Sequence, residues 1–338
     1  MDLSVFSKHK KHVAPWLSLL KDNLLETTSQ LLVSSMNVAH IGYAFTMSDI
    51  KTITVPVTFY GLVSSPQLPG IHTTARLLVW VWVNLLHFCA ANQMYSAEED
   101  AANKPYRPIP AGLMTVKSAV VLRWALIPIC LLLSWMDGAL LPGISLCLSF
   151  LAYNEGGLDS RWQVFLFSHR VVFFLIILSF SALRYSKSLL NAWGIVSWDV
   201  GASIIASAEK PSLHERYWLA PFLSFGLIWT TIHIQDFRDE VGDRMQGRIT
   251  FPTLSPEGSR YFTLFIINLW TIGLGWYWNL SMVGYSLFAA FGLYLSLRTF
   301  LQRTEHDDKV SLRVYMLWLT IARTLPFLAE HGSLLLVR

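Results

Sequence analysis

The chain has 338 residues, of which 53% are hydrophobic and 14% aromatic, while only 14% are charged. A soluble domain carries roughly 25% charged residues, so this composition excludes an ordinary soluble protein and indicates an integral membrane protein with several spans. The formal net charge of +4 is too small to indicate a nucleic-acid partner, and the partner that the apolar composition predicts is membrane lipid.

The N-terminal segment, residues 1–48, is expected to lie in the cytosol or at the membrane interface. Its basic run Lys8–His12 is followed by mixed, charged sequence rather than by an apolar core, so the pattern of a cleavable signal peptide is absent. Residues 13–47 have the composition of one or two amphipathic interfacial helices. We predict one transmembrane domain over residues 49–338, because no linker or change of composition divides it.

Apolar runs long enough to cross a bilayer follow one another along this domain. A run at 188–208 is weaker than the others, because Asn191, Trp198-Asp199 and Gly201 interrupt it. The expected fold is therefore an all-α membrane bundle. We predict nine transmembrane helices, over residues 49–66, 75–92, 115–135, 138–154, 164–183, 217–235, 260–279, 282–300 and 312–330.

Two acidic stretches lie at the ends of predicted spans, at Asn92–Asp100 (NQMYSAEED) and Asp236–Asp243 (DFRDEVGD). Carboxylates beside a membrane core are costly, and a chain usually keeps them there for chemistry. A single acidic run at a helix end is more often a solvated cap. Here each run is followed by a basic run with Pro or Gly, at 103–108 and at 244–252, and this repeated order favours a site for a metal ion and a diphosphate.

Helical spacing places the oxygen ligands of each stretch on one helix face. These residues are Asn92, Ser96 and Asp100 in the first stretch, and Asp236, Asp239 or Glu240, and Asp243 in the second. Mg²⁺ prefers oxygen ligands and is usually held by one or two carboxylates together with substrate phosphates. Once neutralised, a prenyl diphosphate becomes a leaving group whose departure leaves an allylic cation. The basic side chains expected to bind the diphosphate are Lys104, Arg107, Arg244 and Arg248.

The two acidic stretches can serve one site only if they face the same side of the membrane, so an even number of spans has to separate them. The four strong runs between 115 and 235 meet this condition, whereas counting 188–208 as a fifth would break it. We therefore predict that 188–208 does not cross, and that the N-terminus and both acidic stretches face the cytosol. The positive-inside bias agrees except at 184–216, where Lys and Arg fall on the predicted outer side.

Aromatic residues are frequent inside the predicted spans, and two interpretations stay open for them. They either line a pocket whose π faces stabilise a carbocation, or form an interfacial belt and contact lipid. The residues are Trp80, Trp82, Phe88, Trp124, Tyr153, Phe165, Trp229, Phe265, Trp276, Tyr294 and Tyr315. His87 and His233 are expected to be packing residues, and Asp199 an interfacial or loop residue.

The two stretches together resemble the motifs of the UbiA superfamily of intramembrane prenyl-converting enzymes, over about residues 49–330. The first family motif has an Asn, then Asp one, four and eight positions later, then Asn-Lys/Arg-Pro-x-Arg-Pro. Asn92, Asp100 and the run Asn103–Pro108 match it. The second motif matches at Asp236, Asp239, Asp243, Gly247, Thr250 and Pro252. The resemblance implies nine transmembrane helices around a central aromatic-lined cavity that binds Mg²⁺ and a prenyl diphosphate.

The first motif departs from the family pattern at two positions. Gln93 stands where an Asp is usual, as in the homogentisate-type branch, and Ser96 stands where a third acid is expected, while Glu99 adds an acid at an unusual place. A transferase that prenylates an aromatic acceptor normally keeps the acid at the Ser96 position. The sequence therefore looks more like the fungal UbiA-type terpene cyclases, which are lyases of secondary metabolism.

The resemblance implies an enzyme of the endoplasmic reticulum membrane that ionises farnesyl diphosphate and cyclises it to a sesquiterpene hydrocarbon of the β-trans-bergamotene type. It implies that Asn92, Asp100, Asp236, Asp239 and Asp243 hold Mg²⁺, with the four aspartates as catalytic residues. One alternative is a UbiA prenyltransferase acting on an aromatic or quinone-precursor acceptor. The other is a non-enzymatic transporter or receptor, which is disfavoured because transporter ionisable residues lie near the bilayer midplane rather than at span ends.

Overall fold

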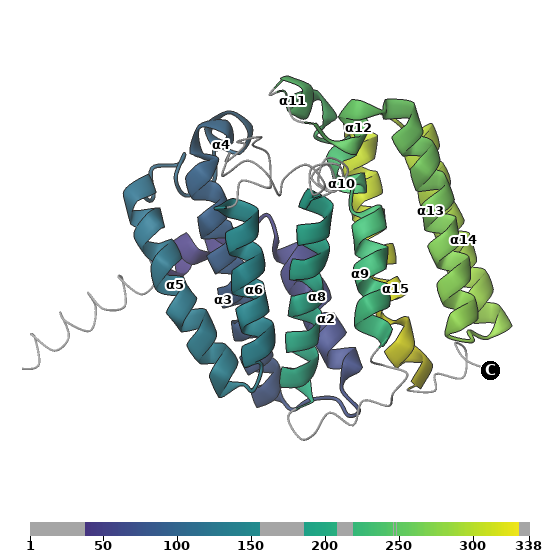
Figure 1. Cartoon of the computed structure of the whole chain (residues 1–338), viewed down its shortest axis with the longest axis horizontal. Helices are drawn as coiled ribbons and strands as arrows, with labels where there is room; N and C mark the ends of the chain where they lie inside the picture. The colour runs from purple at the N-terminus through teal and green to yellow at the C-terminus, as the bar shows by residue number, and fades with distance from the viewer. Residues whose placement is uncertain (1–37, 156–185, 208–218, 246, 248, 331–338) are drawn as a thin grey trace, which may run out of the picture.

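The computed structural model describes residues 38–155, 186–207, 219–245, 247 and 249–330. Figure 1 shows the long helices side by side, with the short helices α4, α10, α11 and α12 gathered at one end of the bundle. The predicted all-α class is confirmed over these ranges. The helices are, in chain order, the π-helix η2 (Ile50–Thr54) and the α-helices α2 (Val55–Ser64), α3 (Ile71–Tyr95), α4 (Ala97–Asn103), α5 (Val116–Met136), α6 (Leu140–Asn154), α8 (Ser186–Ala206), α9 (Leu219–Thr231), α10 (Ile234–Phe237), α11 (Glu240–Met245), α12 (Phe251–Leu254), α13 (Pro256–Tyr277), α14 (Met282–Leu301) and α15 (Glu305–Glu330).

Three helices of the described part of the chain are long and apolar enough to cross a membrane, namely α3, α5 and, from Lys187 onward, α8. Two shorter apolar helices run over Ile50–Ser64 and Leu140–Asn154. Helices suit apolar surroundings because each one satisfies its own backbone hydrogen bonds. The long hydrophobic runs therefore form the elements that a bilayer requires.

Local signals in the sequence mark both ends of α5. The side-chain oxygen of Thr115 caps the start of α5 by accepting a hydrogen bond from the backbone N–H of Ser118 at 3.1 Å. After α5 ends at Met136, Gly138 adopts a φ of 71°, a conformation that favours glycine. The chain reverses there, so α6 returns beside α5 toward the end that carries α4 (Figure 1).

The core consists of two clusters of buried side chains that share α8. The first cluster contains residues of α2, α3, α5 and α6, among them Trp80 and Phe150. The second contains residues of α9, α13, α14 and α15, among them Trp318. α8 contributes Trp198 to the first cluster and Ala192 to the second, so it joins the two halves of the bundle.

The prediction that 188–208 does not cross is wrong, because α8 runs through the middle of the bundle between α6 and α9 (Figure 1). The residues that interrupt its apolar run have partners there. Asp199, expected in an interface or loop, accepts a hydrogen bond from Arg323 of α15 at 2.6 Å, and both side chains are buried. Gly201 lies against the ring of Trp80 on α3, where a larger side chain would collide. The interruptions therefore mark contacts between helices.

Both motifs nevertheless lie at one end of the bundle, as the parity argument requires. In the described ranges the long helices between the motifs are α5, α6, α8 and α9, an even number. α8 begins near the second motif, where the Nζ atom of Lys187 lies 2.8 Å from Asp236, and ends where Ser65 donates a hydrogen bond to the Ala206 carbonyl at 3.3 Å. The predicted span 164–183 lies outside the described residues.

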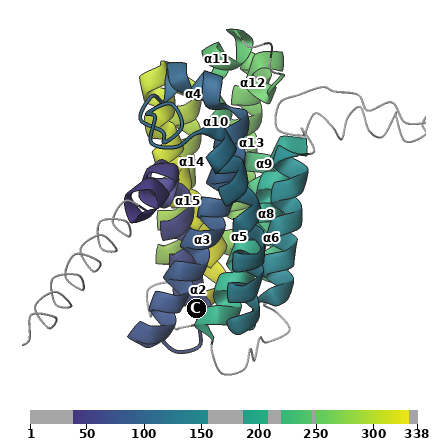
Figure 2. The same cartoon turned by 90° about the vertical axis from the view of Figure 1, so that its left-hand side faces the viewer.

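Residues 38–46 form a helix that packs on the outside of α3 (Figure 2, purple). Gln93 of α3 donates from Nε2 to the carbonyl of Phe45 at 2.8 Å, and Trp82 donates from Nε1 to the hydroxyl of Thr46 at 3.1 Å. Phe45 itself is fully buried. This segment is therefore anchored near the first motif, whereas most of the interfacial helices expected over 13–47 fall outside the described residues.

Replacing Arg323 by methionine should lower the free energy of unfolding by about 3–5 kcal/mol, because Asp199 would stay buried without its cation. Denaturant-induced unfolding in detergent micelles measures the change. The matched control is Lys309→Ala, which breaks the exposed pair with Glu305 and should leave stability nearly unchanged. Equal effects of the two substitutions would contradict the role given to the buried pair.

Candidate functional site

The first motif sits where one helix breaks into two. α3 ends at Tyr95 and α4 begins at Ala97, with Ser96 between them at φ −107° and ψ 20°. Asp100 is only 3% exposed, and both its carboxylate oxygens accept hydrogen bonds from Nη1 of Arg107, at 2.8 and 2.7 Å. The Ser96 hydroxyl donates to the same carboxylate at 3.0 Å. Ser96, at the position of the missing acid, therefore orients Asp100. The continuous helix face that was expected over 92–100 is interrupted at Ser96.

The other predicted residues of this motif surround the same junction. Asn92 is half-buried on the last turn of α3, and its backbone carbonyl accepts a hydrogen bond from the Ser96 hydroxyl at 3.2 Å. Lys104 caps the end of α4 and is half-buried. Arg107 is 7% exposed, and its Nε atom is buried without a hydrogen-bond partner. The structure thus brings Asp100 and Arg107 into direct contact. Lys104 lies between them in the chain, at the end of α4.

The second motif is also divided between two short helices. Asp236 on α10 and Asp243 on α11 are 5% and 3% exposed, so both carboxylates are buried. Asp239 lies between the two helices and is exposed, with Oδ2 3.3 Å from Nε of its neighbour Arg238. The expected single face of three aspartates is therefore wrong for Asp239, because the chain turns between α10 and α11.

Lys187 at the start of α8 is the site residue that the sequence analysis missed. Its Nζ atom forms an ion pair with Asp236 at 2.8 Å, and Asp243 is close enough to act electrostatically on the same ammonium group. The positive-inside argument put Lys187 on the outer side because 164–183 was counted as the crossing before it. No local sequence signal identifies Lys187, because its partner Asp236 lies 49 positions further along the chain.

The two cations that the second motif was predicted to contribute to diphosphate binding are Arg244 and Arg248. Arg244 is exposed and pairs along its own helix with Glu240, at 3.1 Å through Nε and 2.9 Å through Nη2. Arg248 lies outside the described residues. Among the described residues, Arg107 contacts the buried carboxylate of Asp100 and Lys187 contacts that of Asp236.

An aromatic cluster lies one turn before Asn92, among α3, α6 and α8. The ring of Phe88 lies 5.2 Å from that of Phe150 and 5.5 Å from that of Tyr153, and Phe150 lies 5.2 Å from Trp198. Other aromatic residues considered for a pocket are exposed on the bundle, as expected for contact with lipid: Trp124, Trp229, Phe265, Trp276 and Tyr294. Phe165 lies outside the described residues.

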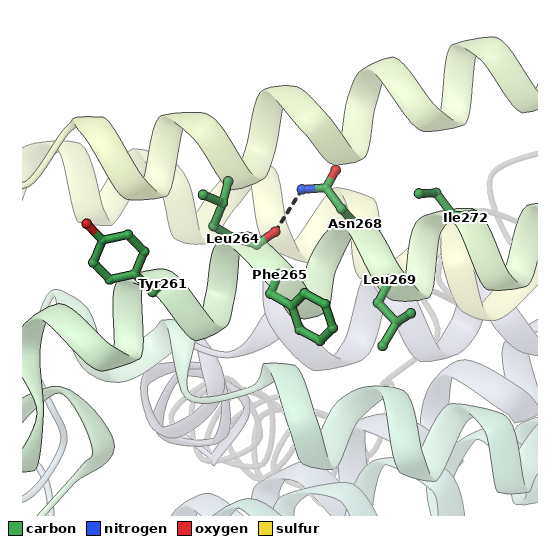
Figure 3. Close-up of a pocket in the computed structure, with 6 residues that line it drawn as sticks. All are labelled: Tyr261, Leu264, Phe265, Asn268, Leu269 and Ile272. Carbon is green, nitrogen blue, oxygen red and sulfur yellow. Dashed lines mark hydrogen bonds between the residues drawn. The ribbon is translucent and has the colours of Figure 1, made fainter.

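A hollow on the surface of α13 lies apart from both motifs (Figure 3). It has a volume of about 540 Å³, and the residues that line it are Tyr261, Leu264, Phe265, Asn268, Leu269 and Ile272. Asn268 is the only amide side chain among these lining residues, and its nitrogen already donates a hydrogen bond to the Leu264 carbonyl of the same helix at 2.7 Å. This apolar groove is not the predicted central aromatic-lined cavity, which stays a prediction.

The chemistry of the motif side chains fits Mg²⁺, whose preferred ligands are carboxylate and amide oxygens. Asp100, Asp236 and Asp243 are buried at the same end of the bundle, and a buried carboxylate requires a nearby cation. Within the described residues, however, no three His, Cys, Asp or Glu side chains already converge on one point. Asp100 is held instead by Arg107, and Asp236 by Lys187.

The comparison with protein families defines the class. The UbiA prenyltransferase family matches residues 53–321, which is most of the chain. The chain therefore belongs to the UbiA prenyltransferase family, whose members are integral membrane enzymes, and the resemblance seen in the motifs is confirmed.

Similar proteins include two synthases and a polyprenyl transferase. The chain is 31% identical over 290 residues to the fumagillin β-trans-bergamotene synthase of Aspergillus fumigatus, covering 84% of this chain and 90% of that protein. It is 23% identical to the somaliensene A/B synthase of Streptomyces somaliensis, with the same coverage of 84% and 90%. It is also 27% identical to a polyprenyl transferase of Hericium erinaceus, covering 68% of this chain and 74% of that protein.

Solved structures share the fold. A digeranylgeranylglyceryl phosphate synthase superposes with a TM-score of 0.59 at 18% identity, covering 87% of this chain and 97% of that chain. A UbiA homologue from Archaeoglobus fulgidus bound to GPP and Mg²⁺ gives a TM-score of 0.54 at 13% identity, covering 85% and 99%. These likenesses support the UbiA-type arrangement of the helices.

The placement of Lys187 can be tested by cross-linking. In a background without the three native cysteines, Lys187→Cys and Asp236→Cys should be joined by a short bifunctional thiol reagent, because their side chains form an ion pair. Lys187→Cys combined with Ser64→Cys should not react, because Ser64 bonds to Ser203 near the other end of α8. The opposite pattern would place Lys187 away from the second motif.

Proposed function

We propose that the chain is a Mg²⁺-dependent terpene cyclase that ionises farnesyl diphosphate and cyclises it to a sesquiterpene hydrocarbon. The observation that carries the proposal is the pair of buried motif carboxylates, Asp100 and Asp236, each held by a cation at one end of an apolar bundle. The relation to the bergamotene synthase of Aspergillus fumigatus favours the cyclase reaction and a product of the β-trans-bergamotene type.

Ser96 supports a cyclase rather than a transferase. At this position a transferase of the family normally has an acid, whereas here the Ser96 hydroxyl bonds to Asp100. A cyclase needs no second substrate, because the double bonds of the prenyl chain themselves trap the cation. The site therefore has to ionise the diphosphate and shield the cation, but not to activate an acceptor.

We propose that α2, α3, α5, α6, α8, α9, α13, α14 and α15 are the transmembrane helices of the described part of the chain and surround a central aromatic-lined cavity, while the predicted span 164–183 lies outside the described residues. The two motifs would face the cytosol, with the protein in the endoplasmic reticulum membrane. Phe88, Phe150, Tyr153 and Trp198 would form the part of the cavity wall nearest the first motif. Their π faces would stabilise positive charge on the prenyl chain and exclude water from it.

The residues proposed to hold Mg²⁺ are Asn92, Asp100, Asp236, Asp239 and Asp243. When bound, Mg²⁺ neutralises charge on the diphosphate and makes it a better leaving group. Lys104 and Arg107 would bind the diphosphate from the first motif, and Lys187 would add a positive charge from the second. Arg248 stays a proposed partner, and so does Arg244, which would have to leave Glu240 and turn toward the site when substrate binds.

A UbiA prenyltransferase acting on an aromatic or quinone-precursor acceptor is the second candidate. It is favoured by the description of the family and by the relation to the polyprenyl transferase of Hericium erinaceus. It would use the same diphosphate site, so the two candidates differ in whether turnover needs an acceptor.

Membranes that contain the protein should convert farnesyl diphosphate to a volatile hydrocarbon in the presence of Mg²⁺ and without an acceptor, as measured by gas chromatography and diphosphate release. Turnover that starts only when an aromatic acceptor is added would support the transferase instead. Absence of turnover with every prenyl diphosphate chain length would contradict both and return a transporter or receptor to consideration.

Asp100→Asn and Asp236→Asn should each reduce diphosphate release by about 100-fold or more, because each removes charge from the proposed site. The matched control is Asp137→Asn, which removes a carboxylate paired with Arg76 in the turn after α5, at the end of the bundle away from the motifs. It should keep near wild-type activity. A similar loss in all three variants would show that the assay reports on folding rather than on the site.

A further inference from the structure

Asp49 carries a carboxylate that its own helix does not use. It is the residue before the π-helix η2, but its side chain makes no capping hydrogen bond, although an Asp at a helix start commonly does so. Its Oδ2 atom instead accepts a hydrogen bond from the thiol of Cys89 on α3, at a distance of 3.8 Å. The half-buried carboxylate is therefore directed at α3.

Cys89 lies on the helix face that leads to the first motif. It precedes Asn92 by three positions and Ser96 by seven, and residues at this spacing share one face of a helix. Lys104 and Arg107 are near enough to act electrostatically on the same thiol. Asp49 therefore lies on the side of α3 that carries Cys89, close to residues proposed to bind the diphosphate.

Three contacts fix this position of the N-terminal segment. Gln93 and Trp82 hold Phe45 and Thr46, as described above, and the hydroxyls of Ser48 and Tyr106 lie 3.4 Å apart. Gln93 occupies a position where the family usually has an Asp, and its amide donates the hydrogen bond, which a carboxylate could not do. Gln93, one departure from the family motif, thus holds the N-terminal segment that carries Asp49. The other departure, Ser96, lies three positions further along the chain.

The charge of Asp49 has no basic partner within ion-pair distance in the described ranges, unlike the charges of Asp100 and Asp236. An independent sign of an incomplete site is the Nε atom of Arg107, which is buried without a hydrogen-bond partner. A half-buried carboxylate at the edge of an apolar bundle favours a neighbouring cation. In the described ranges, the N-terminal segment and the first motif thus carry one carboxylate without a basic partner and one buried guanidinium nitrogen without an acceptor.

We propose that Asp49 replaces the acid that is missing at position 96 and supplies a carboxylate to the cation site of the first motif, directly or through a bound water. The first motif would then be complete in three dimensions although it is incomplete in sequence. This inference rests on the proposed function, because it concerns the Mg²⁺ and diphosphate of the same site.

The test measures binding of Mn²⁺ with inorganic diphosphate to the purified protein in detergent, by the rise in melting temperature and by electron paramagnetic resonance. Asp49→Asn removes the charge but keeps an oxygen that can accept the Cys89 thiol, and it should weaken Mn²⁺ binding about tenfold or more. The double variant Asp49→Asn with Ser96→Asp should regain most of that loss. Asp137→Asn is the control and should bind as the wild type does.

Unchanged Mn²⁺ binding in Asp49→Asn, or a loss that Ser96→Asp does not repair, overturns the inference. If Asp49→Asn does not fold, the single variant Ser96→Asp decides. A gain of about tenfold or more from that variant would show that the first motif lacks an acid, whereas a smaller gain agrees with Asp49 already supplying it. Failure of the wild type to bind Mn²⁺ with diphosphate would instead contradict the proposed function itself.

Discussion

Lys187 and Asp199 lie about 18 Å apart along α8 at the rise of an α-helix, and each pairs with a residue from the C-terminal half of the bundle. Removing a charge from water is costly, so each of these groups needs an oppositely charged partner inside the folded bundle. The pair of Lys187 with Asp236 joins α8 to the second motif, and the pair of Asp199 with Arg323 joins α8 to α15. These two contacts determine how the halves of the protein meet.

The site follows from that arrangement. Because α8 holds Asp236, the second motif lies at the end of the bundle where α3 breaks at Ser96 and presents Asp100. The first motif has its own internal pair, Asp100 with Arg107, so both motifs place a buried carboxylate beside a cation. The aromatic cluster of α3, α6 and α8 lies on the apolar side of this charged end. This arrangement of charged pairs beside an apolar, aromatic cluster suits the ionisation of a diphosphate.

Much of this could be predicted from the sequence, because motif spacing and apolar runs are local properties. The helical class and the family follow from such patterns, and so does the choice of Asp100, Asp236 and Asp243 as candidate site residues. The roles of Lys187 and Asp199 could not be predicted, because each depends on a partner far away in the chain. The sequence argument took Asp199 as an interruption of a span, whereas in the bundle it is half of an ion pair. The exposure of Asp239 also escaped prediction, since the break between α10 and α11 has no clear sequence signal.

The central claim is that the two motifs form one diphosphate site at one end of the bundle. A cryo-electron microscopy structure with Mg²⁺ and an uncleavable analogue of farnesyl diphosphate tests it most directly. The account predicts that the diphosphate lies between Asp100 and Asp236, within ion-pair distance of Arg107 and Lys187, with the prenyl chain against Phe88 and Trp198. A diphosphate that contacts only one motif, or that binds at another end or face of the bundle, would contradict it.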